Sequence, residues 1–222
     1  SDTKVFNIVK ASSSIGIEVK EINKVGENIV ITLTRSNTEG EVSVTINGKA
    51  QPITGNKVYV SDLGEGTYTI VANLSSTSNY EASSNAKVFY VVKNNLTVTL
   101  SDINDIKVGT EVTFTATLNE SAKGNVVFNI NGVNYIVSID GKTTTYKYTP
   151  VNNATLNVIA TFTGNDKYNA NSSALKQYNV NSVESAISLS DVTIEVGQNA
   201  KIEITVTHKL TGATDVTGGV HV

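Results

Sequence analysis

The residues of this chain that could carry out chemistry are few and scattered. Its 222 residues include no cysteine and two histidines, His208 and His221. The sequence has no Gly-x-Ser-x-Gly, no His-Glu-x-x-His and no phosphate-binding glycine loop, so the usual nucleophile, zinc and phosphate motifs are missing. Neither histidine recurs in the repeats described below, and we expect both at the surface. The sequence therefore predicts a protein that is not an enzyme and uses no cofactor.

Aspartates are the candidate ligands for a metal ion. They are spread singly along the chain, without the clustered Asp-x-Asp pattern that calcium prefers. Aspartate is also common in turns, where its side chain accepts hydrogen bonds from nearby backbone. We interpret the candidates as turn residues and predict no metal site. They are Asp102, Asp105, Asp166 and Asp191.

Covalent modification is a second kind of chemistry to weigh. Five Asn-x-Ser/Thr sequons occur, at Asn73, Asn95, Asn119, Asn153 and Asn171. The asparagine, serine and threonine content alone predicts about six, so the number is no sign of selection. Asn95, Asn153 and Asn171 lie in predicted loops and are the candidates for glycosylation.

An isopeptide bond between lysine and asparagine is a further possibility in a sandwich. Lys20 on the first expected strand and Asn85 near the last make a conceivable pair. Lys20 has no counterpart in the second repeat. We therefore interpret both residues as exposed polar side chains.

The chain repeats with a period of 83 to 88 residues. The segment Lys-Val-Phe-Asn-Ile-Val-Lys at 4–10 returns as Lys-Val-Phe-Tyr-Val-Val-Lys at 87–93, and Ile-Asn-Gly at 46–48 returns at 130–132. A period of this length is one small domain. We expect a window on a longer array. It comprises the terminal strand of a preceding module at 1–13, complete modules at 14–94 (module one) and 95–183 (module two), and the first half of a further module at 184–222.

Alternating apolar and polar residues predict strands throughout. Ile29, Ile31 and Leu33 share one face of an expected strand at 28–35, and Val112, Phe114 and Ala116 do so in module two. This period of two, with one apolar face, is typical of antiparallel sheets that have one side in water. In module one we expect strands at 15–21, 28–35, 40–47, near 53, and at 57–60, 67–74 and 87–93. Seven short strands per module predict an all-β fold of tandem immunoglobulin-like antiparallel sandwiches.

Turn residues agree with this strand pattern. Asn47-Gly48 and Asn131-Gly132 predict tight hairpins, because both central residues of such turns need positive φ. Gly26, Gly109 and Gly197 each stand two or three residues before a strand and suit turns.

Three tyrosines are singled out by position. We expect the hydroxyl of Tyr68 to tie the turn before the penultimate strand, where module two has Leu156 instead. Tyr80 and Tyr168 stand in the loop before the last strand, and we predict that they are structural anchors of that loop. Stacking on a ligand is the alternative role for these two rings.

Composition excludes several classes of function. The net charge of −3 leaves no basic face for nucleic acid. No stretch approaches 18 apolar residues, so we expect no membrane span. Only 17% of residues are charged, and the polar surface is built mainly from Ser, Thr and Asn. Such a surface is common in extracellular β-proteins, although AT-rich genomes also favour asparagine. The linkers, at 94–95 and 181–185, are short enough to limit bending between modules.

Several motifs resemble bacterial-type immunoglobulin-like repeats, the tandem domains of adhesin-like surface proteins of bacteria and archaea. The motifs are at 40–48, 66–72 and 79–84, and in the second copy at 124–132, 154–160 and 166–173. The resemblance covers essentially the whole chain, but its motifs are structural, so it implies fold and setting rather than activity. It implies a stalk or fibre that projects from a cell.

Three functions remain open at this point. The first is a non-catalytic structural segment of an extracellular, cell-surface stalk, whose partners are neighbouring repeats of the same or identical chains. The second is a filament subunit joined by strand exchange through residues 5–10. The third is a module that binds a cell-surface glycan or a protein of another cell, with its site in loops such as 164–171.

Overall fold

The computed structural model describes residues 2–199 and 201–208, and this part of the chain contains strands and no helix. The chain divides into two compact units. Unit 1 consists of Ser1–Leu96 and Thr163–Asn171, and unit 2 of Thr97–Phe162 and Ser172–Val222. The segment Thr163–Asn171 is thus part of unit 1, although it stands within module two in the sequence.

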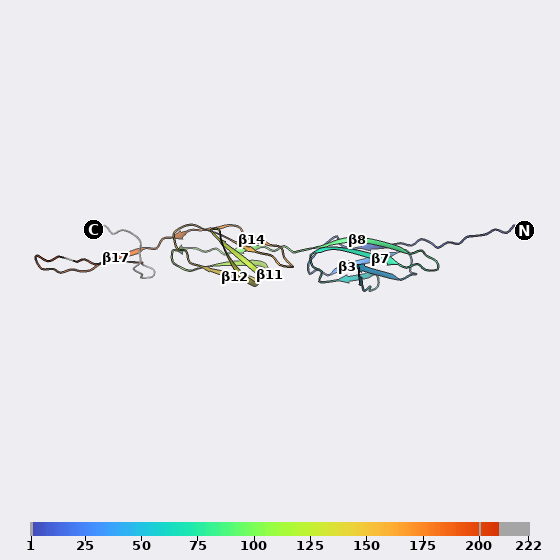
Figure 1. The fold of residues 1–222 in the computed structure, drawn as a ribbon, viewed down its shortest axis with the longest axis horizontal. Coiled ribbons are helices and arrows are strands. Elements are labelled where there is room, and N and C mark those ends of the chain that lie inside the picture. The colour runs from blue at the N-terminus through green and yellow to red at the C-terminus, as the bar shows by residue number, and fades with distance from the viewer. Residues whose placement is uncertain (1, 200, 209–222) are drawn as a thin grey trace. The chain divides into compact units, whose positions relative to one another are not determined.

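Unit 1 contains a sandwich of two sheets, visible in Figure 1 as two layers with β3 in one and β7 and β8 in the other. The first sheet has the order β1-β3-β6 and the second β2-β8-β7-β4-β5. The strands are β1 (Ile15–Glu18), β2 (Ile22–Lys24), β3 (Ile29–Arg35), β4 (Val42–Ile46), β5 (Lys49–Gln51), β6 (Lys57–Val60), β7 (Gly66–Leu74) and β8 (Ser83–Val92).

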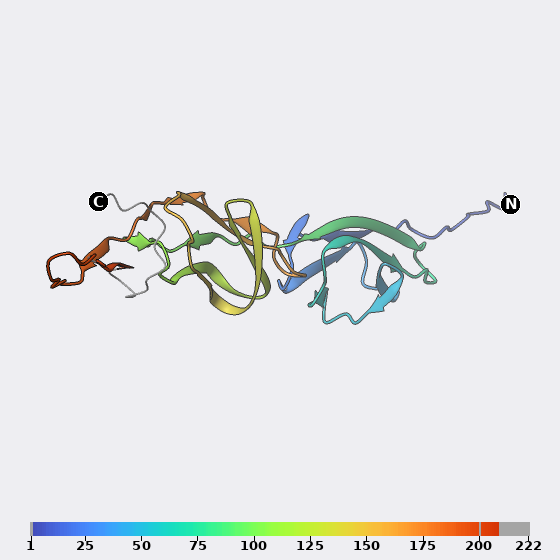
Figure 2. The same ribbon diagram turned by 60° about the vertical axis from the view of Figure 1, so that its left-hand side comes forward.

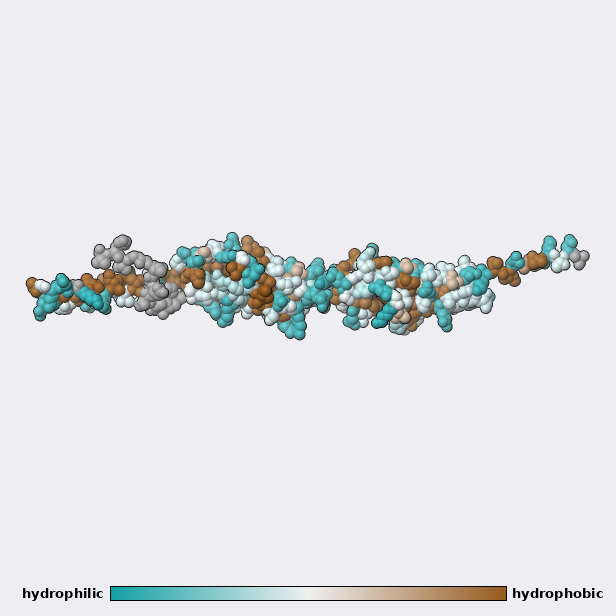
Figure 3. Space-filling model, viewed as in Figure 1, coloured by the Kyte–Doolittle hydropathy of each residue, from teal (hydrophilic) through white to brown (hydrophobic). Residues whose placement is uncertain are grey.

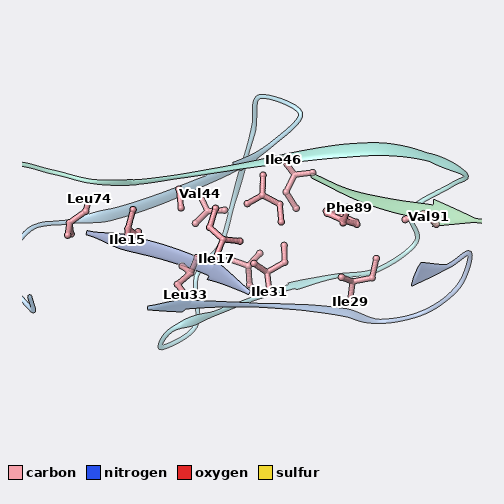
Figure 4. Close-up of a cluster of buried hydrophobic side chains, with 13 residues drawn as sticks. Ile15, Ile17, Ile29, Ile31, Leu33, Val44, Ile46, Leu74, Phe89 and Val91 are labelled. Carbon is pink, nitrogen blue, oxygen red and sulfur yellow. The ribbon is translucent and has the colours of Figure 1, made fainter. Parts of the chain in front are cut away.

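The core of unit 1 lies between these two sheets. Ile29, Ile31 and Leu33 of β3 are buried and the intervening Val30 is exposed, as the alternation predicts. Figure 4 shows the isoleucines of one sheet and side chains such as Phe89 of the other pointing toward one another. Since the side-chain period of a strand is two, this burial pins the register of every strand.

The first strand of module one differs from the prediction. Residues 15–21 form no single strand. Instead, β1 pairs antiparallel with β3 in one sheet, and β2 pairs parallel with β8 in the other. The chain passes from the first sheet to the second at Val19 and Lys20. One strand cannot pair with β3 in one sheet and with β8 in the other, so the strand is interrupted here. The buried side chain of Asn23 donates from Nδ2 to the Lys20 carbonyl oxygen at 2.9 Å, which satisfies backbone at the crossing.

Unit 2 contains the sandwich of module two. Its strands are β9 (Val98–Leu100), β10 (Ile106–Lys107), β11 (Val112–Ile130), β12 (Val133–Tyr148), β13 (Leu156–Phe162), β14 (Asn171–Ser172), β15 (Lys176–Tyr178) and β16 (Val180–Asn181). The main sheet has the order β12-β11-β13-β14, with β9 paired to β11 and β15 paired to β13. β10 and β16 form a separate parallel pair, the counterpart of β2 and β8. Phe114, Phe128 and Phe162 are fully buried in the core.

The long strands β11 and β12 replace pairs of strands in unit 1. By register, β11 takes the places of β3 and β4, and β12 those of β5 and β6. The sequence predicts two separate strands where β11 runs. The register shifts between Thr117 and Ala122, so the strand continues through an irregularity that bends it. Figure 2 shows the resulting curved ribbons, coloured green to yellow.

A further antiparallel pair follows, formed by β17 (Ser185–Leu189) and β18 (Ile204–His208). It carries the start of the predicted partial module. His221 lies outside the described residues, and so does the side chain of His208. The prediction of an all-β fold of immunoglobulin-like antiparallel sandwiches is confirmed.

The two Asn-Gly hairpins are confirmed and do more than turn the chain. Asn47 and Asn131 have φ of 47° and 49°. In each, the backbone amide and the side chain bond to a third strand, which is β7 for Asn47 and β13 for Asn131. Asn47 Oδ1 accepts from the Thr69 amide at 2.8 Å, and Asn131 Oδ1 accepts from the Asn157 amide at 2.7 Å. The side chain therefore extends the sheet ladder where the hairpin leaves it.

Tyr68 ties its turn as predicted. Its hydroxyl donates to the Gly64 carbonyl oxygen at 3.0 Å, and its ring stacks on Phe89 with centroids 5.3 Å apart. Leu156, at the matching place in module two, is buried. The predicted turn glycines Gly26, Gly109 and Gly197 all have positive φ.

Replacing Asn47 by glycine tests the role of its side chain. Asn47→Gly keeps the positive φ but removes the bonds to the Thr69 amide and to the Thr67 carbonyl oxygen. We expect the free energy of unfolding of unit 1 to fall by about 1–2 kcal/mol, as measured by urea denaturation. Asp62→Gly is the matched control, because Asp62 also has positive φ but bonds only to its neighbour Ser61. Equal losses in both variants would contradict this role.

Candidate functional site

The loops of Tyr80 and Tyr168 form the same arrangement twice in unit 1. Tyr80 makes a parallel bridge with Ala11, and Tyr168 makes one with Asn94. The Ala11 amide donates to the Asn79 carbonyl oxygen at 2.8 Å, and the Glu81 amide donates back to Ala11 at 2.9 Å. We call this arrangement, a linker residue held between the two flanking peptides of a tyrosine loop, the linker clamp.

The second linker clamp repeats these bonds with the same lengths. The Asn94 amide donates to the Lys167 carbonyl oxygen at 2.8 Å, and the Asn169 amide donates to the Asn94 carbonyl oxygen at 2.9 Å. Ala11 and Asn94 are 83 residues apart, as the sequence repeat requires. The linker clamp therefore occurs twice in unit 1, with the same spacing as the sequence repeat.

Each tyrosine loop is shaped by one polar side chain. Thr77 Oγ1 accepts from the amides of Asn79 and Tyr80, at 3.2 and 3.1 Å. Asn165 Oδ1 does the same for Lys167 and Tyr168, at 2.9 and 2.8 Å. Threonine and asparagine side chains commonly fold a turn in this way. The loop is thus preorganised to present one carbonyl oxygen and one amide to the linker.

The second clamp has side-chain contacts that the first lacks. Asn94 Nδ2 donates to the carbonyl oxygens of Val25 at 2.9 Å and Lys167 at 3.3 Å, whereas Ala11 has no polar side chain. The Lys167 ammonium lies 5.3 Å from the centroid of the Tyr168 ring. Lys167 Cε also lies 3.7 Å from the place that a Cβ on Gly26 would take. These contacts join the loop to the turn at residues 24–27.

Burial bears on the two roles considered for these tyrosines. The Tyr168 side chain is 7% exposed, and Tyr80 is half-buried. A ring with so little exposed surface offers no face on which a sugar could stack, and the loop backbone is already bonded to the linker. The geometry therefore fits a structural anchor, and it does not favour a ligand site in the loop 164–171.

The three glycosylation candidates differ in what their amides contact. Asn171 Nδ2 donates to the Leu96 carbonyl oxygen at 2.6 Å, so a glycan there would cost that bond. Asn153 Nδ2 donates to Ser182 Oγ at 3.1 Å, between exposed residues. Asn95 Oδ1 accepts a hydrogen bond from Asn169 Nδ2 at 2.8 Å. The Nδ2 atom of Asn95, to which a glycan would be attached, takes no part in that bond. All three asparagines are exposed, and Asn95 is the best placed for modification.

The residues weighed for metal binding and covalent chemistry are not brought together. No group of three or more His, Asp or Glu able to hold a metal occurs among residues 2–199 and 201–208. Asp102 pairs with Lys176, and Asp105 lies 3.4 Å from Lys107. The Lys20 ammonium pairs with Glu27 at 3.2 Å, and Asn85 donates to the Ile15 carbonyl oxygen at 3.0 Å. Each member of the conceivable isopeptide pair thus has a different partner.

A cluster of tyrosines in unit 2 was not predicted. Tyr135 and Tyr146 stack with centroids 4.5 Å apart, and Tyr148 meets Tyr135 edge-on at 6.2 Å. Tyr146 also stacks on the buried Phe128 at 6.0 Å. Burial, and then the neighbouring tyrosines, raise the pKa of Tyr146. The spacing of Tyr146 and Tyr148 places both on one face of a strand, here β12, but their proximity to Tyr135 depends on the register of β12 with β11.

Comparison with unit 1 gives this cluster a structural role. By register, Gln51, Val58 and Val60 stand where module two has the three tyrosines. There, unit 1 has a cavity of about 420 Å³, lined in part by Gln51 and Val60. The tyrosines fill the sandwich edge that smaller side chains leave open.

Tyr178 ties β15 to the residue that follows β9, the first strand of module two. Its hydroxyl donates to the Ser101 carbonyl oxygen at 2.6 Å, and its ring lies 5.3 Å from that of Phe114. Burial, and to a lesser extent the charge of Asp102, raise the pKa of Tyr178 to about 12. The neutral hydroxyl is the form that the fold requires.

The N-terminal segment presents apolar side chains to solvent. Residues 2–10 form no strand, and Phe6 and Ile8 are 84% and 97% exposed. Figure 3 shows this segment as partly brown surface outside the sandwiches. The matching residues of β8, Phe89 and Val91, are buried. No helix in the described residues is long and apolar enough to cross a membrane.

Comparison with known proteins adds the following. No protein-family model matches the chain, and no curated protein matches it. Solved structures that resemble it include the I9–I11 tandem of titin, at 12% identity and a TM-score of 0.41, covering 88% of this chain and 77% of that one. Fibronectin(III)-like modules of CbhA from Clostridium thermocellum match at 16% identity and a TM-score of 0.32, covering 75% of this chain and 93% of that one. At these scores the likenesses carry no argument about function.

The titration of Tyr178 gives a prediction about pH. The unfolded tyrosine ionises near pH 10 and the folded one near 12, so between these values the unfolded state has lost its proton and the folded state keeps it. The stability of unit 2 should therefore fall as pH rises from 10 to 12. In Tyr178→Phe this part of the pH dependence should vanish, as measured by denaturant unfolding at pH 8 to 12. An unchanged slope in the variant would contradict the assignment.

Proposed function

We propose that this chain is a non-catalytic structural segment of a stalk or fibre, in an extracellular, adhesin-like protein at a cell surface. Its task is mechanical: the modules give length and resist tension. The partners are neighbouring repeats of the same or identical chains, and a distant part of the protein contacts a glycan or protein of another cell. The repeat period and the resemblance of residues 40–48 and 66–72 to bacterial-type repeats support this setting.

The observation that carries the proposal is a parallel strand pair in each sandwich. β2 stands near the start of module one and β8 at its end, and they pair in parallel. β10 and β16 do the same in module two. Tension on the chain pulls β2 back through Ile22 and β8 forward through Val92, so it slides one strand along the other.

Sliding two paired strands loads all their hydrogen bonds at once. At one end of the first pair the Tyr90 amide donates to the Glu21 carbonyl oxygen at 2.8 Å. At the other end the Val25 amide donates to the Val92 carbonyl oxygen at 3.0 Å. Each such bond contributes roughly 0.5–1.5 kcal/mol. Bonds that must break together resist force better than bonds that break in turn.

The turn after β2 offers a variant that removes one of these bonds. The Glu27 amide donates to the Lys24 carbonyl oxygen at 3.0 Å, and Gly26 has a φ of 86°. This is the pattern of a type II turn, in which proline is common at the second residue, here Val25. Val25→Pro therefore suits the turn and removes the amide that bonds to Val92, and it also replaces a partly buried side chain that packs against the core.

We expect Val25→Pro to weaken module one against force. In single-molecule pulling through the chain ends, its unfolding rate at a fixed force should rise by about three- to tenfold, because 1.4 kcal/mol is a factor of ten. Module two should be unchanged, and Val108→Pro should instead weaken module two, since the Val108 amide donates to the Asn181 carbonyl oxygen at 3.1 Å.

A control variant removes hydrogen bonds outside the parallel pair. Ser75→Pro loses the amide that donates to the Glu41 carbonyl oxygen at 3.0 Å and the hydroxyl that accepts from the Glu41 amide at 2.8 Å. This variant should lower equilibrium stability and leave the unfolding rate under force nearly unchanged. The mechanical proposal would be wrong if Val25→Pro and Ser75→Pro had the same effect under force.

A second candidate function rests on the exposed segment 4–10. Its counterpart β8 lies inside a sheet between β7 and β2, so segment 4–10 has the pattern of a strand that completes a sandwich. Strand exchange with identical chains would bury Phe6 and Ile8 and build a filament. Sedimentation over a range of concentrations tests it. Filaments that disappear in Phe6→Ser would favour it, and a monomer at all concentrations would rule it out.

A further inference from the structure

We propose that the segment Thr163–Asn171 makes the second linker clamp of unit 1 depend on the folding of unit 2. The inference is independent of the proposed function, because it concerns only how the chain is folded. Its basis is that the segment belongs to unit 1 by its contacts, while the residues on both sides of it belong to unit 2.

Inside unit 1 the segment is held by a series of hydrogen bonds. Two backbone bonds join it to Asn94 in the second linker clamp, at 2.8 and 2.9 Å. Asn169 Nδ2 donates to Asn95 at 2.8 Å, and Asn171 Nδ2 donates to the Leu96 carbonyl oxygen at 2.6 Å. The Asn94 side chain bonds to both Val25 and Lys167. Residues 94–96 thus rely on this segment for most of their polar contacts.

Burial adds to these bonds. Leu96 is 1% exposed and Tyr168 is 7% exposed. Buried amides and carbonyls that lose their partners cost free energy, as does re-exposed apolar surface. If the segment left, the end of β8 and the turn at Val25 would lose partners as well. The structure of unit 1 around residues 94–96 is therefore less stable without residues 163–171.

The two ends of the segment are fixed by unit 2. Phe162, the last residue of β13, is fully buried there. On the other side, the Ser173 amide donates to the Ala160 carbonyl oxygen at 2.8 Å, and the Ala160 amide donates to Ser173 Oγ at 3.0 Å. These bonds close the nine-residue loop. When unit 2 unfolds, the loop becomes part of a long flexible chain and must pay the entropy of ordering again to bind unit 1.

The first linker clamp is an internal control, because all its residues precede Asn94. Ala11, the loop at 79–81 and all the residues between them belong to unit 1, so their contact does not require unit 2 to be folded. Unfolding of unit 2 should therefore release the second clamp and leave the first closed. The amides of Asn94 and Ala11, each bonded at 2.8 Å, report on the two clamps separately.

Native-state hydrogen exchange of the full chain, followed by NMR, tests the proposal. Val158→Ala and Phe128→Ala remove fully buried side chains from the core of unit 2. Core truncations of this kind destabilise strongly. We expect exchange of the Asn94 and Asn169 amides to accelerate at least about tenfold in Phe128→Ala, and less in Val158→Ala, through opening of unit 2. The Ala11 amide should stay within about twofold of its original rate.

Thr145→Ala, at an exposed position in unit 2, is the control variant and should change none of these rates. If Phe128→Ala unfolds unit 2 outright, an unprotected Asn94 amide supports the proposal. A protected Asn94 amide in that variant overturns it. So does unchanged Asn94 exchange in Val158→Ala while the amides of β11 and β13 accelerate.

Discussion

Everything in this molecule depends on the burial of one face of each strand between two sheets. The chain has no cysteine, so no disulfide bond stabilises either sandwich. Ile31, Val58, Phe114 and Phe128 are fully buried in the cores. A shift of the strand register by one residue would move these side chains from the core to the face exposed to solvent. The fixed register then places the parallel pair β2 and β8, from which the proposed resistance to tension follows.

Much of this fold can be predicted from the sequence because its signals are local. The alternation of Ile29, Ile31 and Leu33 depends only on neighbours in the chain, and so does the demand of Asn47-Gly48 for positive φ. The turn tied by Tyr68 also closes within five residues. Because the modules repeat, most of these patterns occur twice in the sequence. Agreement between the two copies supports a strand or turn that one copy alone predicts only weakly.

What could not be predicted depends on pairing between distant residues. The alternation of Ile15, Ile17 and Val19 stops at Glu21, but this break alone does not show a change of sheet, because β2 is assigned to the second sheet by its pairing with the distant β8. The contact of Tyr135 with Tyr146 requires the register of β11 with β12. Likewise, the role of Asn94 becomes visible only when residues 163–171, some seventy positions later, are placed against it.

The dependence of strength on pulling direction tests the mechanical account most directly. Because the chain has no cysteine, a pair of introduced cysteines can serve as the two points through which force is applied. Force applied through Glu21→Cys and Lys93→Cys would slide β2 along β8. Force applied through Lys49→Cys and Lys87→Cys would separate the strands of the second sheet one hydrogen bond after another, because it acts across the strands. Lys49, Ile46, Ile70 and Lys87 form one row across that sheet. The account predicts that module one unfolds at a clearly higher force in the first direction. Equal forces, or a higher force in the second, would contradict it.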